Sequence, residues 1–156
     1  MKIRRGTPTD VPRALEIWRS AVDATHQFLS PADRATIDEL VAGHFLPNAD
    51  LWLAVDELDR PMGFLVMEGA RIDALFVEAS VHGQGYGSLL VDHAASMATH
   101  LTVDANEQAT NAVPFYLSRG FRIVGRSPTD DQGRPYPLIH LALTFDSSKT
   151  RTRPVD

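Results

Sequence analysis

The chain has 156 residues and a formal net charge of −5, with 15 Lys and Arg against 20 Asp and Glu. This length fits one domain with a single substantial core, and the charge argues against a nucleic-acid-binding surface. The absence of cysteine excludes disulfides, thiolate metal sites and a covalent acyl-cysteine step. The N-terminal segment lacks the apolar run of a signal peptide, and no segment suits a membrane span, so we expect a cytoplasmic protein.

The first third of the chain is predicted to form a short strand and two helices. Residues 2–5 are the candidate strand, and Thr9 is a candidate cap for the first helix, with Pro12 in its first turn. Residues 23–29 leave this helix, and Ser30 and Pro31 open a second one that runs to about His44. The first helix has a core-facing stripe made of Val11, Leu15, Trp18 and Val22.

Next comes a hairpin, followed by a strand, a glycine-rich turn and a helix. Residues 50–55 and 62–67 alternate as hairpin strands around a turn at 57–60. Residues 72–77 form a short apolar strand that only Asp73 interrupts. After it come Gly83, Gly85 and Gly87, and then a helix whose apolar residues, at helical spacing, are Leu89, Leu90, Ala94 and Met97.

The last third is predicted to add a strand, a helix and two closing strands. Residues 101–106 are the strand, and a helix capped near Asn111 carries Pro114 in its first turn and ends at Gly120. Residues 121–125 and 136–145 close the sheet around a polar loop at 127–134. The predicted fold is therefore mixed α/β, in the order β-αα-βββ-α-β-α-ββ, as one domain over residues 1–146 with a flexible tail at 147–156.

The glycine turn predicts a phosphate-bearing ligand. Glycines let backbone N–H groups approach a ligand closely, and the dipole of the following helix favours an anion. A flexible surface turn is the plainest alternative. A dinucleotide fingerprint fits less well, because Ser88 takes the place of its third glycine and five residues separate the strand from Gly83. The P-loop is excluded, since no Gly-Lys-Ser/Thr sequence follows.

The turn resembles the pyrophosphate signature of the GNAT acetyltransferases, Gln/Arg-x-x-Gly-x-Gly/Ala, which follows a strand carrying Leu75, Phe76 and Val77 here. The matching residues are His82-Gly83-Gln84-Gly85-Tyr86-Gly87. His82 departs from the pattern at its first position, although an imidazole also donates to phosphate. The resemblance implies that acetyl-CoA is bound by the strand, by this turn and by Ser88.

A second set of residues carries the resemblance further. GNAT enzymes show Asn-x-x-Ala-x-x-Leu/Phe-Tyr-x-x-x-Gly-Phe, and this chain matches at Ala112, Phe115, Tyr116, Gly120 and Phe121. Ala109 replaces the usual asparagine. Phe115 and Phe121 are expected in the core, whereas the family places the tyrosine beside the coenzyme sulfur. A bacterial, YjaB-type branch is indicated by residues 22–26, 73–76 and 106–108 and by the segment 131–138.

The resemblance implies an N-acetyltransferase that uses acetyl-CoA as acyl donor and no metal, with direct attack by an amine in a ternary complex. Asn106 and Ala112 complete the expected coenzyme site. The amine needs a base, for which the candidates are Asp73, His26, Asp130 and Asp131. The expected acid is Tyr116, with Tyr136 as the reserve or as a wall of the acceptor pocket. An amide near Phe76 or Val77 is expected to stabilise the oxyanion, which requires a splayed central strand pair.

Two other functions stay open at this point: a non-catalytic acyl-CoA-binding module and a dinucleotide-binding oxidoreductase domain. The tyrosine at 116 argues against the first, and the gap before Gly83 argues against the second. The expected partner is a small-molecule or protein amine, with no nucleic acid and no membrane. The sequence leaves the identity of the amine and a homodimer open.

Overall fold

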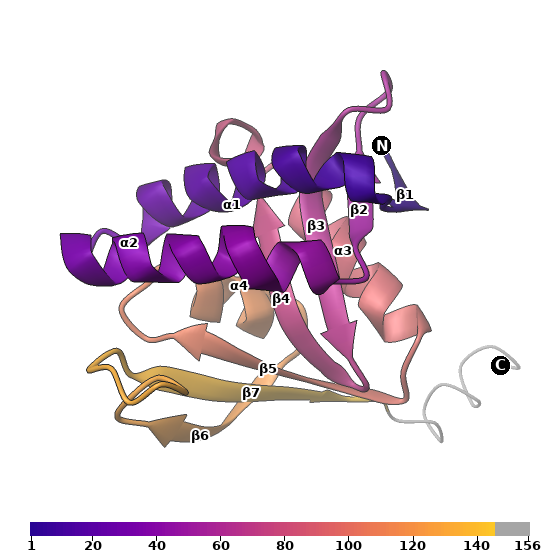
Figure 1. Cartoon of the computed structure of the whole chain (residues 1–156). Helices are drawn as coiled ribbons and strands as arrows, with labels where there is room; N and C mark the ends of the chain where they lie inside the picture. The colour runs from indigo at the N-terminus through magenta and orange to yellow at the C-terminus, as the bar shows by residue number, and fades with distance from the viewer. Residues whose placement is uncertain (146–156) are drawn as a thin grey trace, which may run out of the picture.

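The computed structural model describes residues 1–145 as a mixed sheet with helices on both faces (Figure 1). The predicted flexible tail at 147–156 lies outside the described residues. The strands are β1 (Lys2–Arg5), β2 (Trp52–Val55), β3 (Pro61–Glu68), β4 (Arg71–Val77), β5 (His100–Asn106), β6 (Arg122–Ser127) and β7 (Leu138–Thr144). The helices are α1 (Val11–Thr25), α2 (Pro31–Leu40), α3 (Tyr86–Ser96) and α4 (Ala112–Ser118). This element order confirms the predicted α/β fold.

The seven strands lie in the order β1-β2-β3-β4-β5-β7-β6. Neighbouring strands are antiparallel except for β4 and β5, which are parallel because α3 crosses over between them. This parallel pair stands at the centre of the sheet. Strands β1 to β3 extend the sheet on the β4 side, and β7 and β6 extend it on the β5 side. Each of these two halves is antiparallel.

The central pair is splayed. Strands β4 and β5 are paired only at Arg71 with Thr102 and Ile72 with Val103, although β4 continues to Val77. A β-bulge lies at the point of separation, because the β3 partners of Ile72 and Ala74 are consecutive residues. Asp73 is therefore the extra residue of β4, and the bulge bends the strand away from β5. The splay that the family resemblance implied is present.

Two apolar clusters fill the two faces. One lies under α1 and includes Ile17, Trp18 and Phe64, and the other lies under α3 and α4 and includes Leu90, Leu101 and Leu141. Helix α1 therefore covers one face of the sheet beside β4, while α3 and α4 cover the other face (Figure 1). Because both helical layers pack against the splayed pair, the gap between β4 and β5 opens inside the fold.

Several predicted boundaries were wrong. Thr9 does not cap α1, because a 3₁₀ turn at Pro8–Asp10 precedes the helix and the Asp10 carboxylate accepts from the Thr7 amide at 2.8 Å. Helix α2 ends at Leu40 and continues as a π turn over Val41–Phe45, so the expected end near His44 holds only for the helical path as a whole. Strands β6 and β7 begin one and two residues later than expected, at Arg122 and Leu138.

Candidate active site

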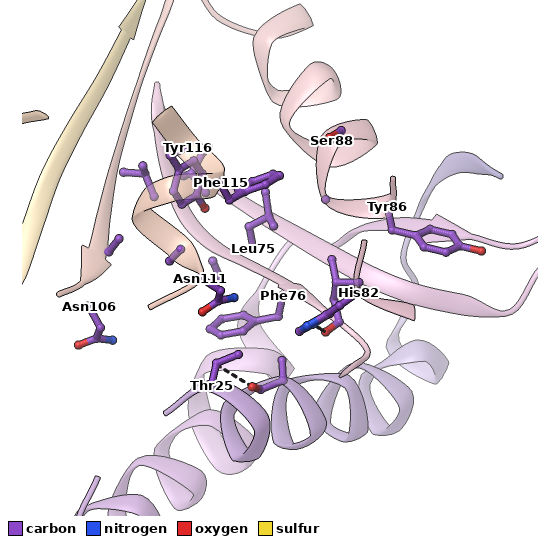
Figure 2. Close-up of a pocket in the computed structure, with 18 of the residues that line it drawn as sticks. Thr25, Leu75, Phe76, His82, Tyr86, Ser88, Asn106, Asn111, Phe115 and Tyr116 are labelled. Atoms are coloured by element: carbon purple, nitrogen blue, oxygen red, sulfur yellow. Dashed lines mark hydrogen bonds between the residues drawn. The ribbon is translucent and has the colours of Figure 1, made fainter. Parts of the chain in front are cut away.

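A cleft of about 500 Å³ occupies the gap between β4 and β5 (Figure 2). Its walls come from the end of α1, from β4, from the glycine turn, and from β5 and α4. The expected site residues in its lining are His26, Asp73, Leu75, Phe76, Val77, His82, Gly83, Gly85, Tyr86, Gly87, Ser88, Asn106, Ala112 and Tyr116. The structure thus brings together most of the residues that the sequence singled out.

The register of β4 decides which of its amides face the cleft. The amide of Glu78 donates to Met62 of β3 at 2.8 Å, and amides alternate between the two edges of a strand. The amide of Phe76 consequently faces β3, and those of Leu75 and Val77 face the cleft. This corrects the expectation that Phe76 is a candidate oxyanion donor: its side chain lines the cleft, but its N–H does not point there.

The glycine turn has the backbone conformation that only glycine adopts without strain. Gly83 and Gly85 have φ values of 81° and 100°, and Gly85 is the residue that caps α3. Gly87 has a different role, because a Cβ there would lie 3.2 Å from the ring of Phe115. The turn therefore presents the start of α3 to the cleft, with its positive dipole end toward any bound anion.

The expected turn residues do not all point into the cleft. Tyr86 extends away from the other labelled side chains in Figure 2 and is buried in the core under α3. Its contribution to the site is therefore its backbone. Gln84 is not among the lining residues. The Nε2–H of His82 donates to the Val77 carbonyl at 2.7 Å, which ties the turn to the end of β4.

The Tyr116 side chain is buried on α4 beside Phe115 and Phe121, with 6% of its surface exposed. It lines the cleft, and none of the side-chain hydrogen bonds within residues 1–145 involves its hydroxyl. Burial raises the pKa of Tyr116 well above its usual range, so the phenol stays protonated at neutral pH. An uncharged O–H donor therefore faces the cavity.

His26 ends α1 and is held from both sides. The Thr25 hydroxyl donates its only proton to the Ala21 carbonyl. His26 Nδ1 lies 2.7 Å from the Thr25 hydroxyl oxygen, so Nδ1 must carry the proton and donate it to that hydroxyl. The other ring nitrogen then accepts from the Asn106 amide at 3.2 Å. Burial lowers the pKa of His26 to about 4. A neutral ring with its lone pair already engaged is poorly suited to act as a base.

Two carboxylates enter the cleft where the strands separate. Asp73 sits in the bulge of β4 and accepts from Arg71 at 2.8 Å. Asp104, on β5, was not among the residues expected to act in acetyl transfer, although it lies where a dinucleotide-binding domain would place its ribose-binding acid, and its partner is His140 at 2.6 Å. The signal in the sequence was an acidic residue on the polar side of an alternating strand, but alternation alone does not say which face borders a cavity.

Three other candidates lie outside the cleft lining. The Tyr136 hydroxyl donates to Asp33 at 2.5 Å and accepts from the Ser30 amide, so it joins the β6–β7 loop to the start of α2. Asp130 accepts the amides of Gln132 and Arg134 and is a turn residue. Asp131 lies in the same loop. The cleft instead gains Thr25, Asn111 and Phe115, which the sequence had not assigned to the site.

Among residues 1–145, no three His, Asp or Glu side chains are grouped so that they could hold a metal ion. Within the same part of the chain, no helix is long and apolar enough to cross a membrane.

The site combines a splayed pair of parallel strands, a glycine turn that opens a helix, and a protonated tyrosine in the gap between the strands. These features are those of a transferase that uses an acyl-CoA donor. The chain belongs to the GNAT acetyltransferases: residues 21–136 match the Acetyltransferase (GNAT) domain. It is thus a GNAT N-acetyltransferase, and the expected family is confirmed.

Characterised relatives cover nearly the whole chain. The peptidyl-lysine N-acetyltransferase YjaB of Salmonella typhimurium is 50% identical over 141 residues, which are 90% of this chain and 97% of that protein. The Escherichia coli YjaB is 48% identical over 142 residues, 91% of this chain and 96% of that one. The solution structure of apo-form YjaB from E. coli superposes with a TM-score of 0.87 at 46% identity, over 93% of this chain and 98% of that one.

Proposed function

We propose that this enzyme transfers the acetyl group of acetyl-CoA to the side-chain amine of lysine residues in proteins. The observation that carries the acetyl-transfer step is the splay of β4 from β5, with Tyr116 in the lining of the cleft between them. The YjaB relatives are named for this acceptor, and the chain is half identical to one of them over nearly its full length. A small-molecule amine is the alternative acceptor.

The residues present fit acetyl-CoA. The exposed edge of β4 offers the amides of Leu75 and Val77 to the pantetheine arm and to the thioester oxygen. The turn at Gly83 and Gly85 supports binding of the pyrophosphate at the start of α3. Asn111, the capping residue of α4, adds a polar side chain to the cleft wall.

The proposed chemistry is direct attack by the amine. A lysine ammonium has a pKa of about 10.4 and must first lose a proton, for which Asp73 and Asp104 are the carboxylates in the cleft. Tyr116 then donates its O–H to the leaving sulfur. Because its pKa is raised, the phenol acts mainly as a hydrogen-bond donor to the developing thiolate.

The experiment measures release of the free thiol and the mass of the acceptor together. The protein is incubated with acetyl-CoA and a peptide with one internal lysine, beside the same peptide with arginine at that position. Thiol release with a gain of one acetyl group on the lysine peptide alone supports the proposal. Modification of small amines with no modification of any lysine peptide would reassign the acceptor, and binding without turnover would indicate a non-catalytic module.

A further inference from the structure

Three polar side chains form a hydrogen-bonded row across the C-terminal half of the sheet. His140 on β7 lies between Asp104 on β5 and Ser127 at the end of β6. His140 Nδ1 is 2.6 Å from Asp104 Oδ1, and His140 Nε2 is 2.6 Å from Ser127 Oγ. Of the three, only Asp104 lines the cleft. The row therefore begins in the cleft and leads away from it.

The strand register builds this row. Asp104 and Gly125 are the two cross-strand partners of His140, so all three lie on one face of the sheet. Gly125 leaves room for the imidazole, because a Cβ there would lie 3.3 Å from its Cδ2 atom. Ser127 is two residues further along β6 and points to the same side. The His140 imidazole therefore packs over Gly125 and has a hydrogen-bond partner at each ring nitrogen.

The protons of the row can be placed by chemistry. An ionised carboxylate can only accept, so His140 Nδ1 carries a proton and donates it to Asp104 Oδ1. In the neutral ring Nε2 must then accept from the Ser127 hydroxyl, which fixes the tautomer. Within residues 1–145, the other oxygen of Asp104, Oδ2, has no hydrogen-bond partner.

We propose that His140, held by Ser127, is a positioning residue that orients Asp104 so that Oδ2 accepts the proton of the incoming amine. In this step the N–H bond of the ammonium breaks, an O–H bond forms at Oδ2, and the nitrogen keeps the electron pair with which it attacks. The inference rests on the proposed function. The order of the three residues also matters: in a hydrolytic triad the serine lies at the substrate, whereas Ser127 lies outside the cleft.

The test compares His140→Asn with His140→Ala. The Asn side chain keeps an N–H near the position of Nδ1, and the Ala side chain removes the donor. The matched control is His100→Asn, an exposed histidine on β5 outside the cleft lining. The measurement is kcat and KM, determined separately, for acetyl transfer to a lysine peptide, with acetyl-CoA affinity by calorimetry and folding by circular dichroism.

We expect His140→Ala to lower kcat/KM by about tenfold or more, with unchanged acetyl-CoA affinity; this is less than the roughly hundredfold or more that a whole base contributes, because Asp104 itself remains. Added imidazole should partly restore kcat/KM. His140→Asn should keep most of the activity, because its amide N–H still donates to Asp104. His100→Asn should match the wild type.

Each remaining outcome overturns the inference. Wild-type kcat/KM in both His140 variants, or equal losses in the two, would remove the positioning role and leave the transferase function standing. A greater loss in Ser127→Ala than in His140→Ala would reassign Ser127 as a nucleophile. If the wild-type protein releases no thiol with the lysine peptide or with small amines, the proposed function itself fails, and the role of His140 falls with it.

Discussion

The Nε2 atom of His26 lies 3.2 Å from the side-chain nitrogen of Asn106, which joins the end of α1 to the end of β5. The two residues are 80 positions apart in the chain. This contact bridges the two sides of the cleft beside Thr25. It requires a neutral ring, because a protonated Nε2 cannot accept a hydrogen bond.

The neutral state of His26 predicts a loss of stability in mild acid. The unfolded imidazole binds a proton below about pH 6.5, and the folded one does so only below about 4, because burial lowers its pKa. Between these two pH values the unfolded state binds more protons than the folded state. The stabilising contribution of neutral His26 is therefore fully present above pH 6.5 and is lost as the pH decreases toward 4. The loss is about 3 kcal/mol at most.

Urea unfolding at several pH values between those limits checks this. In the wild type the free energy of unfolding should decrease as the pH is lowered across this range, and in His26→Gln most of this decrease should be absent. Asp38, whose pKa is lowered to about 2 mainly by its hydrogen bond from Arg19, titrates below the window and does not confuse the comparison. Equal slopes in the two proteins would contradict a buried neutral His26.

Tyr116→Phe is expected to lower turnover by roughly a hundredfold, the scale for loss of one donor or acid in the transition state. Acetyl-CoA affinity should stay similar, since the lost bond matters most as the thiolate forms. Steady-state kinetics with a lysine peptide provide the measurement.

Tyr136→Phe is the matched control. It removes a hydroxyl that bonds Asp33 and Ser30 outside the cleft lining, so it should reduce thermal stability more than turnover. If Tyr136→Phe abolishes turnover while Tyr116→Phe does not, Tyr136 is the catalytic tyrosine.

We expect two alanine substitutions, Gly85→Ala in the glycine turn and Gly69→Ala outside it, to differ in their effect on acetyl-CoA affinity. Gly85→Ala forces a side chain into φ 100° at the start of α3 and should weaken acetyl-CoA binding strongly in a calorimetric titration. Gly69→Ala imposes similar strain, at φ 58° in the β3–β4 turn, with open space around the added Cβ. Each costs about 1–2 kcal/mol of stability. Equal affinities in both folded variants would show that the turn does not bind the coenzyme.

Amide exchange tests the orientation of β4. The amides of Leu75 and Val77 face the cleft and should exchange fast in the free protein and slowly once CoA is bound. The amide of Phe76 faces β3 and should be protected in both states, which makes it an internal control. Strong protection of Val77 without ligand would show that the strands close up in solution.

Elements with local signals can be predicted from the amino-acid sequence alone. Alternating glycines between an apolar strand and a helical repeat specify a turn with positive φ at Gly83 and Gly85, because only glycine adopts that conformation freely. Helix α4 likewise follows from Asn111 as the cap, Pro114 in the first turn and Gly120 after the end. The family resemblance rests on these segments, and it was sufficient to predict the fold.

Which polar groups share the cleft depends on contacts between segments that are distant in the chain. A period of two separates the faces of β5 but does not say that the face of Asp104 borders a cavity. The bulge at Asp73 depends on pairing with β3, and it sets which amides of β4 are free. Tyr136 was a candidate acid by sequence, yet it is bonded to Asp33, 103 residues away. Such contacts join segments that are distant in the chain, and therefore no local pattern specifies them.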